Sequence, residues 1–319
     1  MEIEQTDGTR ISAIREQKGT LVPDLREPGT AAPNWLKNPF IEETKEHESK
    51  KINKTSELNT TIRAFEALLH RGKGGVYRAI DLSLSPGRLC ILKEGRMYGE
   101  MDWDGRDGYW RVQNEANVIS TLRKSGVEEI PKIYSTFKAE SNFYVALEFI
   151  EGQSLQSILN KNIPIKDALI YGIQLARLLD KIHSAGWVWR DCKPLNLIVS
   201  NQGILRPIDF EGAFLIEQPD NMPWVTPGYT PPEMSHNFTV QSRLFEDLYA
   251  LGATLHHLFS GQVPSTSNLP PIGKLRRNIP PSVRKIISTL LNSDPHVRPN
   301  ARTVIETLES AFINNFGKN

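Results

Sequence analysis

The pattern of hydrophobic and polar residues divides the chain into two regions. Residues 1–60 show little hydrophobic periodicity and are rich in Glu, Lys, Thr and Pro, which predicts a polar N-terminal arm or linker. A short apolar stretch at residues 33–41 interrupts this region, and we expect it to dock on the folded part of the chain or to bind a partner. From residue 61 onward, apolar residues recur regularly, as in a folded domain.

The regular region contains patterns for both strands and helices. Short runs in which apolar residues alternate or cluster predict strands at residues 62–69, 76–80 and 89–93. Apolar residues spaced three or four apart predict helices at residues 109–124, 165–183, 282–291 and 301–312. Most of the predicted strands lie before residue 151, and most of the predicted helices lie after it.

Composition and charge exclude several classes of protein. Hydrophobic residues make up 39% and charged residues 24% of the 319 residues, which is typical of a soluble globular protein. The formal net charge of +1 gives no reason to expect binding to nucleic acid or to an anionic membrane. Cys90 and Cys192 are far apart, which favours neither a disulfide framework nor a zinc site. The sequence has no apolar run long enough to span a membrane and no apolar N-terminal segment, so we expect a cytoplasmic protein.

The stretch WVWRDCKPLNLIVS at residues 187–200 carries the main chemical pattern. Asp191 is followed by Lys193 and Asn196, and an apolar run comes next. This spacing resembles the catalytic loop of protein kinases, H-R-D-x-x-x-x-N, with Trp189 in place of the histidine. The resemblance implies that Asp191 accepts or orients a substrate hydroxyl proton, that Lys193 lies near the transferred phosphoryl group, and that Asn196 holds a magnesium ion.

Two predicted strands near the start of the folded region are joined by a glycine-containing turn. The residues Gly72, Gly74, Gly75 and Val76 resemble the G-x-G-x-x-G-x-V loop with which kinases cover the phosphates of ATP. When the motif is aligned on Val76, only Gly74 falls on one of its glycines. A plain hairpin turn is therefore an equally good interpretation of this segment taken alone.

Lys93 ends the predicted strand at residues 89–93, and Glu115 lies on the predicted helix that follows. The pair resembles the Lys and Glu of kinases, in which the Lys contacts the α- and β-phosphates of ATP. Between them, residues 98–107 form an acidic, glycine-containing insertion. We interpret the insertion either as a substrate or partner loop or as a surface addition without a function of its own.

Two further segments resemble the adenine- and metal-binding parts of kinases. Residues 143–152 resemble the strand and hinge between the two lobes of a kinase. This resemblance implies that the backbone of Glu148 and Ile150 hydrogen-bonds adenine and that Leu147 lines the pocket behind it. Asp209 begins the sequence D-F-E, which resembles the D-F-G motif that binds magnesium. Glu211 replaces the glycine of that motif, and we expect its side chain to face solvent, because a third ligand would crowd the metal site.

Acidic residues after the D-F-E sequence match structural positions of kinases. Glu233 ends P-P-E, which resembles the A-P-E at the end of a kinase activation segment, and we expect it to pair with Arg298. Asp247 lies in a sequence that resembles the central helix of the large kinase lobe, where the Asp caps the backbone of the catalytic loop.

These motifs occur in one order over residues 61–312, and together they resemble the protein kinase superfamily, with Lys193 favouring the serine/threonine type. The resemblance implies a two-lobed α+β fold. A small antiparallel β lobe with one helix is expected at residues 61–150, and a large, mainly helical lobe at residues 151–319. It also implies an enzyme that uses ATP and Mg²⁺ to phosphorylate Ser or Thr of a protein or peptide, without a nucleic acid or membrane partner.

A finer resemblance concerns the kinase domain of class III and IV lanthionine synthetases. It is carried by residues 75–78, 92–96, 104–107 and 209–211. In those enzymes the domain phosphorylates a precursor peptide, so one interpretation is a lanthipeptide-type substrate with separate lyase or cyclase partners. The alternative is a catalytically weak pseudokinase that binds nucleotide or peptide, motivated by Trp189, Glu211 and the irregular glycine turn. A small-molecule kinase is disfavoured, because such enzymes usually lack the activation segment and its ion pair.

Overall fold

The structure is a computed structural model, and it describes most of the chain. The described residues are 2–4, 10–15, 18–23, 61–159, 163–218, 220, 224–235, 244–265 and 269–317. The apolar stretch at residues 33–41 and the polar linker that follows it lie outside the described residues. The chain divides into two compact units, Met1–Thr55 and Ser56–Asn319.

The first unit contains a small antiparallel sheet in which β2 pairs with both β1 and β3. Its strands are β1 (Glu2–Glu4), β2 (Arg10–Arg15) and β3 (Leu21–Pro23). The sequence analysis did not predict these strands, because runs of three to six residues are too short to show a clear alternation of apolar and polar positions. The boundaries predicted at residues 60 and 150 stay predictions.

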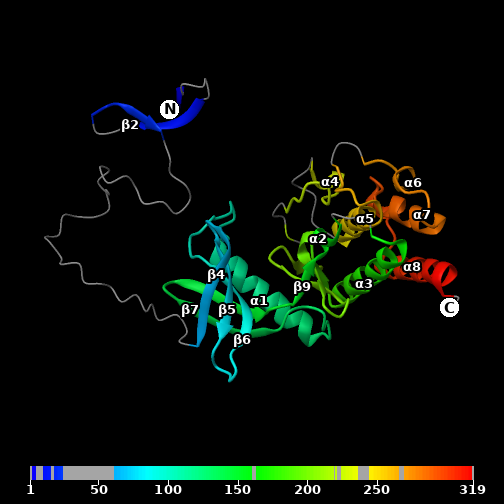
Figure 1. Ribbon diagram of the computed structural model, residues 1–319, viewed down its shortest axis with the longest axis horizontal. Coiled ribbons are helices and arrows are strands. Elements are labelled where there is room, and N and C mark those ends of the chain that lie inside the picture. The colour runs from blue at the N-terminus through cyan, green and yellow to red at the C-terminus, as the bar shows by residue number, and fades with distance from the viewer. Residues whose placement is uncertain are drawn as a thin grey trace. The chain divides into compact units, whose positions relative to one another are not determined.

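The described residues of the second unit include a five-stranded antiparallel sheet, which forms one lobe (Figure 1). In spatial order its strands are β4 (Ile62–Arg71), β5 (Gly74–Asp81), β6 (Arg88–Gly95), β8 (Asn142–Glu148) and β7 (Ile133–Ala139). The sequence analysis missed β7. A register shift between Ile133 and Ser135 breaks its alternation, so the period-two signal is lost.

Helix α1 (Gly108–Lys124) packs on β6 and β8 of this sheet. The side chain of Asp107 accepts a hydrogen bond from the Trp110 N–H at 2.9 Å and caps the first turn of the helix. Glu115, Ile119 and Leu122 share one helix face and are fully buried. Burial of the two apolar side chains determines which face meets the sheet, and it places Glu115 against β6.

The other lobe of this unit is mainly helical (Figure 1). Its helices within the described residues are α2 (Leu155–Leu159), α3 (Ile165–Ser184), η1 (Pro194–Asn196), α4 (Pro232–Ser235), α5 (Leu244–Ser260), α6 (Ile272–Leu275), α7 (Pro281–Leu290), η2 (Pro295–Val297) and α8 (Ala301–Phe316). Helix α3 packs against α5 and α8. Gly172 on α3 permits this approach, because a Cβ there would lie 2.9 Å from the Leu255 side chain. The predicted helices at residues 165–183, 282–291 and 301–312 are confirmed as α3, α7 and α8.

Two short sheets order the loops of the helical lobe. Their strands are β9 (Gly152–Ser154), β10 (Trp187–Val188), β11 (Leu197–Ser200), β12 (Leu205–Pro207) and β13 (Phe214–Leu215). Strand β11 pairs with β9 and β12, and β10 pairs with β13. In the β11–β12 hairpin, the N–H of Ile208 donates to the carbonyl of Asn196 at 2.8 Å, so Asn196 lies beside the segment that begins with Asp209. With one β lobe and one helical lobe, the predicted α+β fold is confirmed.

Candidate active site

Lys93 on β6 and Glu115 on α1 form a buried ion pair. The Lys93 Nζ lies 2.7 and 2.8 Å from the two carboxylate oxygens, and Glu115 is 0% exposed. Burial opposes the ammonium charge, but the carboxylates of Asp209, Glu115 and Glu211 outweigh burial and raise the pKa of this lysine. Burial also raises the pKa of Glu115, and Lys93 acts against that shift. We assign an ammonium–carboxylate pair, because both carboxylate oxygens accept hydrogen bonds from Nζ.

Asp209 lies at the start of the segment after β12 and completes this cluster. Its Oδ1 is 3.6 Å from the Lys93 Nζ. The N–H of the next residue, Phe210, donates to Glu115 Oε1 at 3.0 Å, which ties the segment to α1. Burial alone would raise the pKa of Asp209, but Lys93 and Lys73 hold it below the ordinary carboxyl value. The carboxylate is therefore ionised at neutral pH, as a metal ligand must be.

Trp189, which takes the place of the histidine in the catalytic-loop pattern, connects that loop with Asp209. Its indole N–H donates to the Asp209 carbonyl oxygen at 2.8 Å. Its ring stacks on Phe210, with centroids 5.5 Å apart and planes 25° apart. Asp209 has a φ of +76°, and this hydrogen bond helps to hold its backbone in that uncommon conformation. An indole supplies both a donor and an aromatic face, so the loss of the histidine does not disorder the site.

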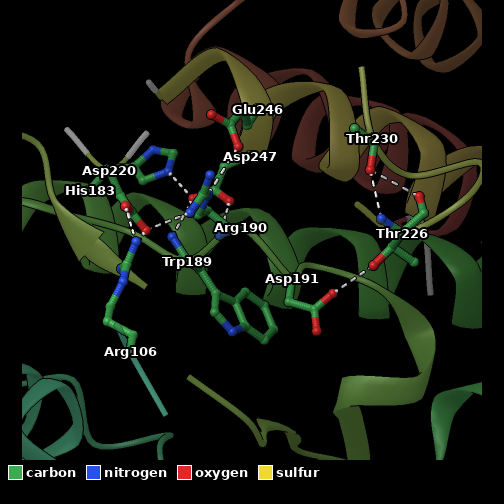
Figure 2. Close-up of polar contacts among 10 residues, drawn as sticks. All are labelled: Arg106, His183, Trp189, Arg190, Asp191, Asp220, Thr226, Thr230, Glu246 and Asp247. Carbon is green, nitrogen blue, oxygen red and sulfur yellow. Dashed lines mark hydrogen bonds and ion pairs between the residues drawn. The ribbon is translucent and has the colours of Figure 1, made fainter. Parts of the chain in front are cut away.

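Asp191 lies at the centre of the catalytic loop (Figure 2). Its Oδ1 is 2.7 Å from the Lys193 Nζ, and its Oδ2 accepts a hydrogen bond from the Asn196 Nδ2 at 2.6 Å. The short helix η1 turns the chain so that Asn196 faces back toward Asp191. Burial raises the pKa of Asp191, and Lys193 partly offsets this shift. A raised pKa makes the carboxylate a better proton acceptor.

Thr226 also contacts Asp191, and the sequence analysis did not assign it to the site. Its hydroxyl donates to Asp191 Oδ1 at 3.1 Å (Figure 2). The Lys193 Nζ lies 3.2 Å from the same hydroxyl. The Thr226 N–H donates to the Thr230 hydroxyl at 2.7 Å, which closes a turn around Gly228. A threonine before Pro-Gly was the available signal, but it predicts a turn and not a contact with the catalytic loop.

Asp247 on α5 holds the backbone of the catalytic loop, and the predicted capping role is confirmed. Its side chain is fully buried, and its two oxygens accept hydrogen bonds from the N–H groups of Trp189 and Arg190, both at 2.7 Å (Figure 2). The His183 Nε2 lies 2.9 Å from the same carboxylate. Arg190 has a φ of +69°, so its backbone conformation depends on such support.

The glycine-containing segment forms a tight hairpin between β4 and β5. Gly72 and Lys73 form its turn, and β5 begins with Gly74, Gly75 and Val76. A Cβ on Gly74 would lie 1.8 Å from the carbonyl oxygen of Glu94 on β6, so the sheet itself requires this glycine. The backbone is that of a hairpin, and contact of its turn with the phosphates of ATP stays a prediction.

Lys73, at the tip of that turn, is hydrogen-bonded to the carboxylate of Glu211. The Glu211 side chain is only 9% exposed, so the prediction that it faces solvent is wrong. The physical reason is a compensating charge: the Lys73 ammonium neutralises the extra carboxylate beside Asp209. Lys73 was given no role from the sequence, so this partner of Glu211 was missed.

Oxygen donors for a metal ion gather at this point. Within the part of the chain that the structure describes, carboxylate oxygens of Glu115, Asp209 and Glu211 lie within 4.8 Å of one another. Hard oxygen ligands suit Mg²⁺. Glu115 and Glu211 each make a hydrogen bond with a lysine, so Asp209 is the carboxylate best placed to bind a metal. The Asn196 amide nitrogen is used by Asp191, which leaves the Asn196 amide oxygen as the second donor.

Leu147, Glu148 and Ile150 lie where β8 ends and the chain enters the helical lobe. Leu147 is buried. The backbone N–H of Glu148 donates to the Lys132 carbonyl at 2.8 Å, and its carboxylate accepts from the Arg206 Nη2 at 2.9 Å. The Glu148 N–H is thus engaged, so the partners left for an adenine ring are the Glu148 carbonyl and the backbone of Ile150.

Arg298 forms the predicted ion pair with Glu233. Its two Nη atoms lie 2.5 and 2.8 Å from the two carboxylate oxygens, and the Arg298 side chain is 0% exposed. The pair holds the end of the segment from Asp209 to Glu233, which we call the activation segment. The beginning of this segment is held by Trp189 and Glu115, as described above.

Comparison with protein families agrees with this arrangement of residues. The family described as "protein kinase domain" matches the chain over residues 72–308, which is most of its length. This chain belongs to the protein kinase family. The match extends from the glycine turn into α8, so it covers the Lys93–Glu115 pair, the catalytic loop and Asp209.

The kinase is similar to several curated bacterial proteins. It is 27% identical over 276 residues to the serine/threonine-protein kinase PknA of Nostoc sp., a match that covers 80% of this chain and 48% of that protein. It is 31% identical over 204 residues to a probable serine/threonine-protein kinase PknB of Lactococcus lactis, covering 60% of this chain and 31% of that protein. A probable SapB synthase of Streptomyces coelicolor is 26% identical over 280 residues, covering 82% of this chain and 28% of that protein.

This kinase therefore spans less than half of the length of the curated relatives named above. The family match confirms the predicted kinase fold. Two of these relatives are named as serine/threonine-protein kinases, the type that Lys193 predicts for this chain. Among the helices of the described residues, none is both long enough and apolar enough to cross a membrane.

Proposed function

We propose that this kinase transfers the γ-phosphate of ATP to Ser or Thr hydroxyl groups of a protein or peptide. The observation that carries the proposal is the surroundings of Asp191, whose Oδ1 lies 2.7 Å from the Lys193 Nζ and 3.1 Å from the Thr226 hydroxyl. A carboxylate beside an ammonium group can orient an alcohol, accept its proton and balance the charge that develops. The hydrogen bond from the Thr226 hydroxyl to Asp191 Oδ1 supports this role, because it shows that this oxygen can accept a hydrogen bond from an alcohol.

ATP would bind between the β lobe and the helical lobe. Lys93, oriented by Glu115, would contact the α- and β-phosphates, and its raised pKa keeps it positively charged for this purpose. The hairpin with Gly72, Gly74, Gly75 and Val76 would cover the phosphates. Leu147, the Glu148 carbonyl and the backbone of Ile150 would receive the adenine.

Asp209 and Asn196 would hold Mg²⁺, which neutralises charge on the phosphates when it is bound. Asp209 fits because two lysines keep its carboxylate ionised. Asn196 fits because the β11–β12 hairpin places it beside the segment of Asp209, with its amide nitrogen directed at Asp191. The protein contributes positioning and electrostatics, and Lys93 and Lys193 supply the remaining positive charge.

Within this class of substrates, a precursor peptide of the lanthipeptide type is our more specific proposal, with lyase or cyclase proteins as separate partners. The similarity to a probable SapB synthase hints at a link with lanthionine synthetases. The resemblance of residues 75–78, 92–96, 104–107 and 209–211 to the kinase domain of those enzymes supports it further.

The substitution Asp191→Asn tests the proposed function. It removes the proton acceptor and preserves the shape of the side chain, so kcat should fall by about 10²- to 10⁴-fold. The affinity for ATP with Mg²⁺, measured by calorimetry, should stay within about threefold, since Asp191 acts on the hydroxyl and not on the nucleotide. Asp180→Asn on α3 is the matched control, because its carboxylate is partly exposed and lies 3.9 Å from Arg302. It should leave both quantities unchanged.

Two results would reject this assignment. Transfer by Asp191→Asn at the rate of the wild type would show that another group activates the hydroxyl. Binding of ATP by the wild type, without transfer to any Ser or Thr peptide, would favour the pseudokinase. Two observations still support that alternative, namely the irregular glycine turn and the Lys73–Glu211 contact. Trp189 no longer supports it, because its indole N–H donates to the Asp209 carbonyl.

A further inference from the structure

Two arginines from distant parts of the chain converge on the carboxylate of Asp220 (Figure 2). Arg106 contacts both oxygens, with Nη1 3.0 Å from Oδ2 and Nη2 2.8 Å from Oδ1. The Arg190 Nη1 lies 3.0 Å from Oδ2. One carboxylate thus accepts three charge-assisted hydrogen bonds, two of them from the same guanidinium group.

Each of these residues belongs to a different part of the site. Arg106 lies two residues before α1, the helix that carries Glu115. Arg190 directly precedes Asp191 in the catalytic loop. Asp220 lies in the activation segment. The contact therefore joins the helix that orients Lys93, the loop that carries the proposed base and the segment that carries Thr226.

The guanidinium group of Arg190 is buried, with only 1% of its side chain exposed. Its Nε lies 3.2 Å from a carboxylate oxygen of Glu246, and its central carbon lies 5.1 Å from the centre of the Phe214 ring. A buried charge is stable only when it is paired and hydrogen-bonded. Removal of the Asp220 charge would leave Nη1 without this carboxylate and would weaken the support of the residue before Asp191.

The sequence of the activation segment offers no phosphate acceptor beside this contact. Between Asp209 and Val225 there is no Ser, Thr or Tyr. The hydroxyls that follow belong to Thr226, Tyr229 and Thr230. Those of the two threonines are bonded to the catalytic loop and within their own turn, and the buried tyrosine hydroxyl lies 2.8 Å from a histidine nitrogen.

Activation loops of kinases can be ordered by phosphorylation, because the added phosphate pairs with arginines. In this chain the side-chain carboxylate of Asp220, which requires no modification, pairs with two arginines. We propose that Asp220 is a positioning residue that orders the catalytic arrangement through Arg106 and Arg190, so that the kinase needs no phosphate on its activation segment. This inference rests on the proposed function. It also gives the insertion at residues 98–107 a role in the site.

The test compares the phosphate-free wild type with variants of Asp220 in the full chain. After phosphatase treatment, verified by mass spectrometry, the wild type should keep its kcat within about twofold. Asp220→Asn should lower kcat at least about tenfold, which corresponds to about 1.4 kcal/mol, and the KM for ATP should stay within about threefold. Asp220→Glu, which restores the charge, should recover kcat to within about threefold of the wild type.

Glu309→Gln is the matched control. Glu309 lies on α8, and its carboxylate is bonded by Arg177 at 2.6 and 3.2 Å. This variant removes a carboxylate–arginine pair that is more exposed and makes no contact with Asp220, Arg106 or Arg190, and both kinetic constants should stay within about twofold. Amide hydrogen exchange supplies a readout that does not depend on activity: residues 189–196 and 224–230 should exchange faster in Asp220→Asn than in the wild type or the control.

A kcat for Asp220→Asn within twofold of the wild type would overturn the inference, and so would a wild type that loses its activity with its phosphate. Failure of the proposed function can be distinguished from failure of the inference about Asp220. If the wild type transfers no phosphate with any divalent metal, the proposed function is wrong, and hydrogen exchange alone decides about Asp220. Unchanged exchange in Asp220→Asn would then reject the positioning role, whereas faster exchange would retain it.

Discussion

Two neighbouring tryptophans allow a direct measurement of how strongly the catalytic loop holds Asp209. Trp189 is 0% exposed and donates its indole N–H to the Asp209 carbonyl at 2.8 Å. Trp187 is 8% exposed, and its indole nitrogen is buried without a hydrogen-bond partner among the residues that the structure describes. Substitution of each by Phe removes the same atoms from a buried site, but only one of the two changes removes a hydrogen bond.

The magnitude follows from this difference. Each substitution loses similar apolar contact, which we expect to cost about 1–2 kcal/mol of the free energy of unfolding. Trp189→Phe additionally leaves the partly buried Asp209 carbonyl without its donor, which costs about 1–3 kcal/mol. Trp187→Phe removes an N–H that has no such bond, so it avoids this cost. Trp189→Phe should therefore be less stable than Trp187→Phe by about 1–3 kcal/mol.

Urea unfolding of the two variants, extrapolated to water, measures the difference. Calorimetry of ATP binding with Mg²⁺ adds a functional readout. The affinity should fall more in Trp189→Phe, because Asp209 has a φ of +76° and loses a bond that holds its backbone. Equal free energies of unfolding for the two variants, within about 0.5 kcal/mol, would refute the assigned role of Trp189.

Two further predictions concern the Lys93–Glu115 ion pair and the buried His257. Lys93→Met should weaken the use of ATP more than Glu115→Gln, and the double variant should lose less than the sum, because Glu115 acts through Lys93; additive losses would contradict this. Burial, aided by His256, lowers the pKa of His257 from 6.5 to about 4, so between these values the unfolded chain binds a proton that the folded chain does not. Stability should therefore fall as pH falls through this window, by up to about 1.4 kcal/mol per pH unit from this residue. The free energy of unfolding in urea should change less between pH 7 and pH 5 in His257→Gln than in the wild type. An equal change in both proteins would show that other groups cause the loss of stability.

Much of the candidate site could be predicted from the sequence, because its spacing is local. Asp191, Lys193 and Asn196 fall within one short turn, so their order along the chain determines their order in space. The Lys93–Glu115 pair was predictable because an apolar strand carrying Lys and a following amphipathic helix carrying Glu resemble the corresponding parts of kinases. Individual helices and strands followed from the hydrophobic periodicities, except where strands were very short or interrupted by a register shift, and the two-lobed arrangement followed from the resemblance to kinases.

The contacts that the sequence analysis missed join residues far apart along the chain. Lys73 and Glu211 are 138 positions apart, and Arg106 and Asp220 are 114 positions apart. Neither pair has a local signal, because charged residues in turns and loops are usually solvated. The error about Glu211 had this origin: crowding of the metal site was considered, but the opposite charge that reaches it from the glycine turn was not.

The activity that we propose for this chain is the transfer of the γ-phosphate of ATP to an alcohol held at Asp191. The most direct test incubates the wild type with Mg²⁺, ATP labelled in its γ-phosphate, and a mixed library of peptides that contain Ser, Thr or Tyr. Label is expected on Ser and Thr side chains, identified by mass spectrometry, and it should disappear without Mg²⁺ and in Asp191→Asn. Label only in inorganic phosphate, only on Tyr, or equally in Asp191→Asn would contradict it.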